Sequence, residues 1–316
     1  MNLPKIHSVT KKIMVALLGG FLLFFLLFHA TANLFILRHD GGAWYSAFCH
    51  FMGSNWVVKV FEVVLLGAIV LHALLTLWLA LTNRLARPTR YHEVQKSKTH
   101  TTSKLMVWTG ILIFVCLIMH FCDFYFVKLG WVKGEYMVKV EKLQDPEMVG
   151  FVQMAQQWNM TPEELVDELE QQSAIYPDND DETARYIAGL RDKLQVMDIV
   201  QRAQQEGNIT DDMVWVRHLT YDERQTLRRV LSESKPEPDF YYMAREKFSH
   251  WHIVLGYLFF FFVIFMHMRH AFPAAFQTLG LNNYKYNNFI EALGRIYAWL
   301  VVLMFAAVPI LVYLGL

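Results

Sequence analysis

Four histidines lie inside long apolar stretches of this chain, where an ionisable side chain is costly and usually serves a function. Each stands in a different stretch, so several helices could bring the imidazoles together. Neutral imidazole is a common metal ligand. The pattern therefore predicts buried, paired metal sites built from His29, His72, His120 and His267.

Five apolar runs must position these histidines, and each is long enough to cross about 30 Å of hydrocarbon with about 20 helical residues. With 54% hydrophobic and 15% aromatic residues, the composition excludes a soluble fold. We predict an all-α membrane protein with five transmembrane helices. The runs are approximately Ile13–Leu37, Trp56–Leu81, Leu105–Phe126, His252–Phe272 and Ile290–Leu314.

The first run has an alternative interpretation as a secretory signal, because Ala30-Thr31-Ala32 resembles a small-residue cleavage site after a charged start. The run is longer than an ordinary signal core, however. Cleavage there would also remove His29 together with its helix. A retained first span is therefore the favoured interpretation.

Lysine and arginine lie mainly in the links that an inside N-terminus would keep inside, as the positive-inside rule requires. Only Arg38 and Lys59 lie in or beside the first outer link. The N-terminus is therefore predicted inside and the C-terminus, after five crossings, outside. The bias is carried by Lys5, Lys11 and Lys12 before the first run, by Arg84, Arg87, Arg90, Lys96, Lys98 and Lys104 before the third, and by Arg269, Lys285 and Arg295 around the last link.

Residues 128–247 differ in composition from the apolar runs on either side. They hold 24 of the 29 acidic residues and 15 of the 29 basic ones, a net charge of −9. The predicted topology places this segment outside, and it is long enough to fold alone. We therefore divide the chain into 1–127 with three spans, 128–247 as an acidic extramembrane insertion, and 248–316 with two spans.

The insertion is predicted to be mostly helical. Thr161-Pro162-Glu163-Glu164 and Thr220-Tyr221-Asp222-Glu223 both have the form of a helix-starting capping box. The segment from Val152 to Thr161 also resembles the segment from Val200 to Thr210, which would fit a repeat of stacked helices. Chance similarity between polar stretches is the alternative.

Depth along the helices sorts the four histidines into two levels, at about 1.5 Å of rise per residue. His29 and His120 stand in the outer halves of outward-running helices. His72 and His267 stand late in inward-running helices, and therefore in the inner half. Because two imidazoles at one depth can bind one iron from opposite faces, we predict an outer and an inner bis-histidine haem.

The cysteines indicate how such haems would be held. Cys49, Cys116 and Cys122 form no C-x-x-C pair and no C-x-x-C-H attachment motif. The haems would therefore be non-covalent, which predicts two haem b groups. No P-loop or dinucleotide fingerprint occurs, so no hydride chemistry is assigned to this chain.

His270 competes with His267 for the inner ligand position, and spacing alone does not separate the two. A family resemblance bears on this choice. The chain resembles the five-helix, dihaem cytochrome b subunit of succinate dehydrogenases and fumarate reductases. The resemblance is carried by the stretch from His29 to Asn33, by the His72 and His120 spans, and by His267-Met268-Arg269-His270-Ala271-Phe272 continuing into Gln277-Thr278-Leu279-Gly280-Leu281-Asn282-Asn283.

In that family the ligand precedes a small residue by four positions and a Thr/Lys-apolar-Gly element by eleven. His267 fits both intervals, with Ala271 and Thr278. The resemblance therefore implies that His267 is the ligand, and it leaves His270 as a candidate propionate contact or structural partner. It covers the five spans but not the insertion, which members of the family lack.

The resemblance implies a membrane-anchor subunit that relays electrons between an iron–sulfur subunit and a membrane quinone, menaquinone by the same resemblance. An FAD-containing flavoprotein subunit would join the iron–sulfur subunit on the cytoplasmic face of a bacterial cytoplasmic (inner) membrane. Dicarboxylate catalysis would take place on the flavoprotein, so no catalytic residue is assigned here. One branch of the family has a proton-conducting Glu where this chain has Phe265.

Two charged residues beside the predicted ligands have two interpretations each. Arg269 could pair with a haem propionate or act as an ordinary positive-inside anchor. Asp123, one turn after His120, could bind a quinone or relay protons, or it could be an interfacial carboxylate that reaches water. The sequence leaves both choices open.

Two other classes of function remain. The chain could be the dihaem anchor of another respiratory complex, such as a hydrogenase or a formate dehydrogenase, which its partners would distinguish. It could also be a non-redox transporter whose histidines bind ions or protons. Such a transporter would lack the paired absorption bands of b haem.

Overall fold

A computed structural model describes residues 8–86, 101–141, 146–175, 181–206, 209–210, 213–231 and 237–316. It forms two compact units, which are described separately. The bundle unit comprises Met1–Phe126 with Tyr241–Leu316, and the insertion unit comprises Val127–Phe240. Several residues of the predicted charge bias, Lys5, Arg87, Arg90, Lys96 and Lys98, lie outside the described ranges.

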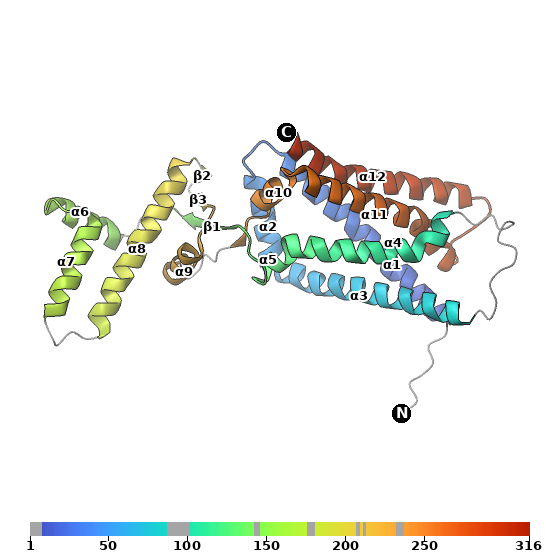
Figure 1. The fold of residues 1–316 in the computed structure, drawn as a ribbon, viewed down its shortest axis with the longest axis horizontal. Coiled ribbons are helices and arrows are strands. Elements are labelled where there is room, and N and C mark those ends of the chain that lie inside the picture. Colours follow the sequence, from blue (N-terminus) through green and yellow to red (C-terminus); the bar gives the residue numbers. More distant parts are fainter. Residues whose placement is uncertain are drawn as a thin grey trace, which may run out of the picture. The chain divides into compact units, whose positions relative to one another are not determined.

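Five helical stretches in the described part of the chain are long and apolar enough to cross a membrane, as predicted. They lie side by side in the bundle unit (Figure 1). The ends differ from the prediction by up to six residues, mostly because the helices continue into polar residues beyond the apolar runs. The helices are α1 (Ser8–Asn33) with a 3-10 turn η1 (Leu34–Leu37), α3 (Trp56–Leu85), α4 (Thr101–His120), α11 (Trp251–Thr278) and α12 (Asn287–Tyr313).

The bundle is centred on α11, which packs against α12, α4 and α1, while α3 packs against α1 and α4. Gly294 of α12 allows a close approach, because a Cβ there would lie 3.0 Å from the ring of Phe272 on α11. The Tyr297 hydroxyl donates to the backbone carbonyl of Leu23, which ties α12 to α1. These contacts fix the four helices that carry the histidines.

Two short helices at one end of the bundle were not predicted from the sequence. They are α2 (Ala43–Ser54) and α10 (Phe240–Phe248). Gly42 precedes α2 with a φ of 84°, and a Cβ there would meet the ring of Tyr241 at 2.4 Å. Only glycine combines that backbone conformation with that contact. α10 therefore packs on the start of α2.

The third span does not end as a regular α-helix. After His120 the chain makes a π-helical turn, η2 (Phe121–Tyr125), followed by the short helix α5 (Phe126–Lys128). Such turns insert one extra residue and often occur at functional sites. Here the turn contains Asp123.

The insertion unit is mostly helical, but it also contains a small antiparallel sheet that the sequence analysis missed. The strand order is β2-β3-β1-β4. The strands are β1 (Tyr136–Glu141), β2 (Ile209–Thr210), β3 (Met213–Val216) and β4 (Glu237–Pro238). The helices are α6 (Pro146–Gln157), α7 (Pro162–Ile175), α8 (Asp181–Gln205) and α9 (Tyr221–Val230).

α8 contributes to both hydrophobic cores of this unit. One core joins α6, α7 and the first half of α8 around Leu165 and Leu190, which are almost fully buried. The other joins the sheet, the second half of α8 and α9 around Val214 and Leu227. The two capping boxes are present as predicted, with Thr161 bonded to Glu164 and Thr220 to Glu223.

The proposed repeat does not correspond to one repeated structural unit. Its first copy lies in α6 and is followed by helix α7, whereas its second lies in α8 and is followed by strand β2. Asn208 of the second copy lies outside the described residues. The shared residues therefore reflect similar amphipathic helices rather than duplicated folds.

The insertion unit begins and ends on neighbouring strands. β1 and β4 pair antiparallel, with Tyr136 opposite Pro238 and Met137 opposite Glu237. The insertion unit ends at Phe240, so the predicted segment 128–247 runs seven residues further and takes in most of α10. The sequence boundary was placed at the change in hydropathy, but α10 is polar enough to resemble the insertion while packing with the bundle.

Candidate functional site

His29 of α1 and His120 of α4 face each other, with ring centroids 6.0 Å apart and planes at 75°. A metal–imidazole nitrogen bond is about 2.0–2.1 Å long, so two ligand nitrogens on opposite sides of one metal ion lie about 4 Å apart. Ring centroids lie about 1 Å further back on each side, which gives about 6 Å between them. The spacing of this pair therefore fits axial ligation of a single iron.

Aromatic rings hold His29 in place. Phe25, one turn earlier, stacks on its ring at 5.3 Å, and Phe305 of α12 packs against it at 5.7 Å. The Asn33 amide donates to the His29 carbonyl at 2.9 Å and accepts from the Tyr45 hydroxyl at 3.0 Å. Burial, followed by the neighbouring Cys49 thiol, raises the pKa of Tyr45, so this hydroxyl stays a neutral donor.

A hydroxyl group orients His120. Its Nδ1 lies 3.4 Å from the hydroxyl oxygen of Tyr257 on α11. That hydroxyl donates to Asp123 Oδ2 at 2.9 Å, and Lys247 of α10 donates to Asp123 Oδ1 at 2.7 Å. The chain of contacts runs from a charged pair at the bundle end to the imidazole.

His72 of α3 and His267 of α11 are the other two predicted ligands. Each stands against a glycine of a neighbouring helix. A Cβ at Gly19 of α1 would lie 3.3 Å from His72 Cε1, and one at Gly110 of α4 would lie 3.6 Å from His267 Cε1. His72 Nδ1 is buried with no hydrogen-bond partner among the described residues. His72 therefore has one ring nitrogen that could bind a ligand.

Thr109 of α4 orients His267 much as Tyr257 orients His120. His267 Nδ1 lies 3.1 Å from the Thr109 hydroxyl oxygen, which donates its own proton to the Met106 carbonyl at 3.0 Å. The threonine oxygen can therefore only accept, so Nδ1 carries the proton and Nε2 keeps its lone pair for a metal.

α4 and α11 serve the two histidine pairs reciprocally. α4 contributes His120 to one pair and Thr109 to the other, while α11 contributes Tyr257 to the first and His267 to the second. The two residues on each helix are ten or eleven positions apart, which places the pairs at two levels separated by about 15 Å. α1 has the same spacing between Gly19 and His29.

Two neutral imidazoles at each level would suit a bis-imidazole haem site. Among the described residues no group of three or more His, Cys, Asp or Glu side chains could hold a metal ion, so a multi-carboxylate centre has no support in that part of the chain. Haem b would be held by His29 and His120 at one level and by His72 and His267 at the other. The unpartnered His72 Nδ1 and the glycines beside both second-pair histidines are consistent with this assignment.

The remaining predicted residues lie around these pairs. Arg269 is exposed, and His270 is half-buried and close enough to act on His267 electrostatically. Asp123 is bonded to Lys247 and Tyr257, so the structure gives it a partner on each oxygen. Phe265 packs against Trp299 at 4.6 Å. The quinone, proton and propionate roles stay predictions.

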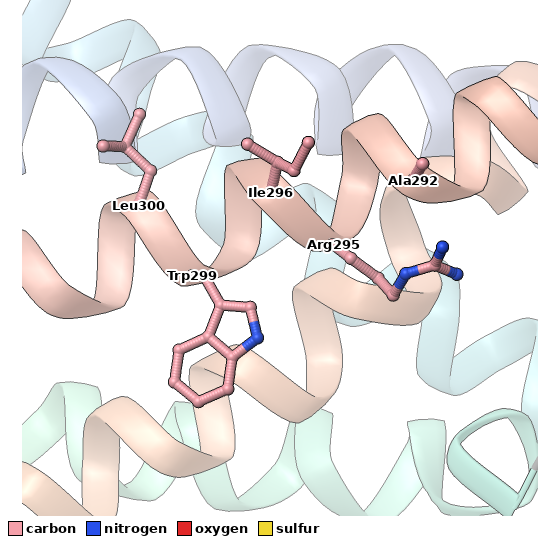
Figure 2. Close-up of a pocket in the computed structure, with 5 residues that line it drawn as sticks. All are labelled: Ala292, Arg295, Ile296, Trp299 and Leu300. Atoms are coloured by element: carbon pink, nitrogen blue, oxygen red, sulfur yellow. The ribbon is translucent and has the colours of Figure 1, made fainter.

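An open groove of about 570 Å³ lies along α12. Figure 2 shows Arg295 and Trp299 projecting from one side of this helix and the apolar side chains of Ala292, Ile296 and Leu300 from the other. The groove is lined by Ala292, Arg295, Ile296, Trp299 and Leu300. None of the four histidines lines it, so it is separate from the paired site.

The sequence analysis missed the residues that orient the histidines. Hydroxyl groups and glycines within apolar runs carry no charge that would mark them as functional. Tyr257 and Thr109 lie ten and eleven residues from His267 and His120 on the same helices. That spacing, matched to the separation of the two levels, is the signal that could have found them.

The chain matches no protein-family model, and no curated protein or solved structure matches it.

Proposed function

We propose that this chain is a dihaem cytochrome b that anchors a respiratory complex in the membrane. The proposal is carried by one observation: the rings of His29 and His120, on two membrane-length helices, have centroids 6.0 Å apart. His72 and His267 lie beside glycines of neighbouring helices and would form a second pair at another level. Two haems held at two levels would suit the transfer of electrons along the bundle.

The protein residues would bind, orient and insulate the haems. Thr109 and Tyr257 set the ring orientation of one histidine in each pair. Apolar helices around the pairs exclude water and leave few charges to compete with the ligands. When bound, haem b supplies a one-electron redox centre whose potential depends on ligation, hydrogen bonding and burial.

Within this class we propose the membrane-anchor subunit of a succinate:quinone oxidoreductase, a succinate dehydrogenase or fumarate reductase. The support is the family resemblance of the five spans, including His267 with Ala271 and Thr278. The partners would be an iron–sulfur subunit and an FAD-containing flavoprotein on the cytoplasmic face of a bacterial inner membrane. The electron acceptor or donor in the membrane would be a quinone, menaquinone by the same resemblance.

Haem counting tests the proposal directly. Pyridine haemochrome analysis of the purified chain, combined with protein quantification, should give two b haems per chain. A fully loaded protein with one haem would contradict the four-ligand arrangement. Protein with no haem and no paired b-type bands would favour a transporter instead.

Copurification tests the complex. In mild detergent the chain should bring down a flavoprotein and an iron–sulfur protein with succinate:quinone reductase activity. Recovery of hydrogenase or formate dehydrogenase subunits would assign the cytochrome to another complex.

Protease accessibility tests the topology. Protease added to intact spheroplasts should cut within residues 128–247 and spare the Arg84–Lys104 link, whereas cleavage confined to that link would reverse the proposed topology.

A further inference from the structure

The contacts behind His120 form a chain that starts from a charged pair. Lys247 Nζ donates to Asp123 Oδ1 at 2.7 Å, and the Tyr257 hydroxyl donates to Asp123 Oδ2 at 2.9 Å. Each carboxylate oxygen is thus held by a different helix, α10 or α11. Asp123 itself lies in the π-helical turn directly after His120.

Tyr257 is well fixed. Its side chain is 9% exposed, and Phe248 packs edge-on against its ring at 5.1 Å. Because its single O–H proton is donated to Asp123, its oxygen can only accept from His120. The distance of 3.4 Å between this oxygen and Nδ1 is long for a hydrogen bond. The contact is therefore weak, but it favours one orientation of the His120 ring.

These contacts determine which ring nitrogen of His120 carries the proton. A hydroxyl oxygen that accepts from His120 requires the proton on Nδ1, which leaves the Nε2 lone pair free to bind a metal. Metal-binding histidines commonly donate their other N–H to a carboxylate or carbonyl in this way. Here a tyrosine stands between the imidazole and the carboxylate.

The second histidine pair provides an internal comparison. His267 Nδ1 meets the Thr109 hydroxyl, which donates to the neutral carbonyl of Met106. His120 has a similar hydroxyl partner, but that hydroxyl donates to a carboxylate. The two pairs therefore share the orienting group and differ in the charge of the group behind it.

We propose that Asp123 and Tyr257 are positioning residues that orient His120 as a haem ligand and increase its electron donation through Nδ1. The inference rests on the proposed dihaem function. Lys247 holds the carboxylate against the tyrosine. Asp123 thus acts on the His29–His120 haem through Tyr257, not on a quinone.

The test uses the full chain with Tyr257→Phe and Asp123→Asn, and with Thr109→Val as the matched control at the other pair. Loss of such supporting contacts typically lowers metal affinity by about 10–100-fold. Tyr257→Phe should release the His29–His120 haem to apomyoglobin faster, shift its low-spin electron paramagnetic resonance signal and raise its midpoint potential, since a less basic imidazole favours ferric iron less. Asp123→Asn should shift the same haem in the same direction by less.

Thr109→Val should affect only the His72–His267 haem. The inference is overturned if folded Tyr257→Phe and Asp123→Asn proteins keep the wild-type signal and potential of the His29–His120 haem. Helical circular dichroism and gel filtration establish folding, and Asp123→Asn alone decides the question if Tyr257→Phe does not fold. A shift confined to the other haem would also overturn it, whereas wild-type protein without haem would remove the proposed function as well.

Discussion

Several polar side chains of the bundle unit contact histidines, whereas those of the insertion unit bond helix ends and surface carboxylates. In the bundle, Asn33, Thr109 and Tyr257 each contact an imidazole-bearing residue. In the insertion, Arg191 bonds Asp167 and Glu170, and Arg229 bonds Asp192, all at the surface. Such exposed pairs contribute little, about 0–1 kcal/mol each.

Glu223 of the insertion unit, like Asp123 of the bundle, has more than one polar partner. Its side chain is 11% exposed, accepts from Arg202 at 2.5 Å and closes the capping box with Thr220. All of these contacts stabilise the start of α9 and its position on α8. The comparison indicates that the bundle uses its polar groups for a ligand and the insertion uses them for its own fold.

The largest expected effect is the loss of one haem when a proposed ligand is removed. His120→Ala should abolish binding at the His29–His120 pair, and His267→Ala should abolish it at the other, because one imidazole cannot hold a low-spin bis-histidine iron. Haem content should fall from two to one per chain in each variant. Optical and electron paramagnetic resonance spectra should show which signal disappears.

His270→Ala is the matched control, one turn from His267 and on the same helix. It should keep both low-spin signals. If His270→Ala removed the signal of the second pair and His267→Ala kept it, the ligand choice taken from the family intervals would be wrong. The same result would leave the His29–His120 pair unaffected.

The next largest effect concerns the insertion core and should spare the haems. Leu165 is fully buried between α6, α7 and α8, so Leu165→Ala should lower the free energy of unfolding of this unit by about 2–5 kcal/mol. Urea-dependent proteolysis of the full chain measures this loss. The control is Val149→Ala on α6, whose side chain is 47% exposed; a haem change in Leu165→Ala would argue against the separation of roles.

Acid should weaken the insertion at Glu223. Burial acts to raise the pKa of this carboxyl, but hydrogen bonds from Arg202 and Thr220 outweigh it and hold the pKa below its ordinary value of 4.5. The ionised form is therefore the one that the fold favours. Its stabilisation is fully present above pH 4.5 and is lost as the pH falls through the lowered pKa.

Glu223→Gln should thus destabilise α9 at neutral pH by about 1 kcal/mol, because glutamine can still close the capping box but cannot pair with the charge of Arg202. The difference from the wild type should shrink below the pKa of the folded protein. Hydrogen exchange of the α9 amides at neutral pH and at a series of lower pH values down to about 2.5 measures both. Glu164→Gln, in the exposed box at the start of α7, is the matched control and should show a smaller, less pH-dependent change; equal behaviour of the two would contradict the role of Arg202.

The sequence predicted the five spans, because a membrane-length apolar run allows few other structures. It also predicted that His29 lies near His120, since depth along a helix follows from residue count. It did not predict the small sheet, because β2 and β4 are two residues long and their pairing depends on contacts distant in sequence. Tyr257 was missed for a similar reason, since its partner Asp123 lies 134 residues away.

Removal of the insertion unit is the largest change to the chain, and we expect it to have the smallest effect on the haems. β1 and β4 pair, so the insertion unit enters and leaves at adjacent points, as is common for domains that tolerate excision. In the bundle, Asp123 and Lys247 are bonded at 2.7 Å. The bundle residues next to the insertion are Phe126 and Tyr241. At 1.5 Å per residue, Phe126 lies about 5 Å along its helix from Asp123, and Tyr241 lies about 9 Å from Lys247.

A linker of about eight glycine and serine residues, which spans up to about 26 Å, should therefore join Phe126 to Tyr241 without strain. The design keeps α10, because Lys247 bonds Asp123 and Phe248 packs on Tyr257. Removal of 127–240 should leave two haems with unchanged low-spin signals. A second deletion that extends through Lys247 is the control, and it should alter only the His29–His120 haem, because it removes the cation that holds Asp123. If both deletions left that haem unchanged, α10 would have no part in the site; if both abolished it, the insertion unit would support the bundle as well as itself.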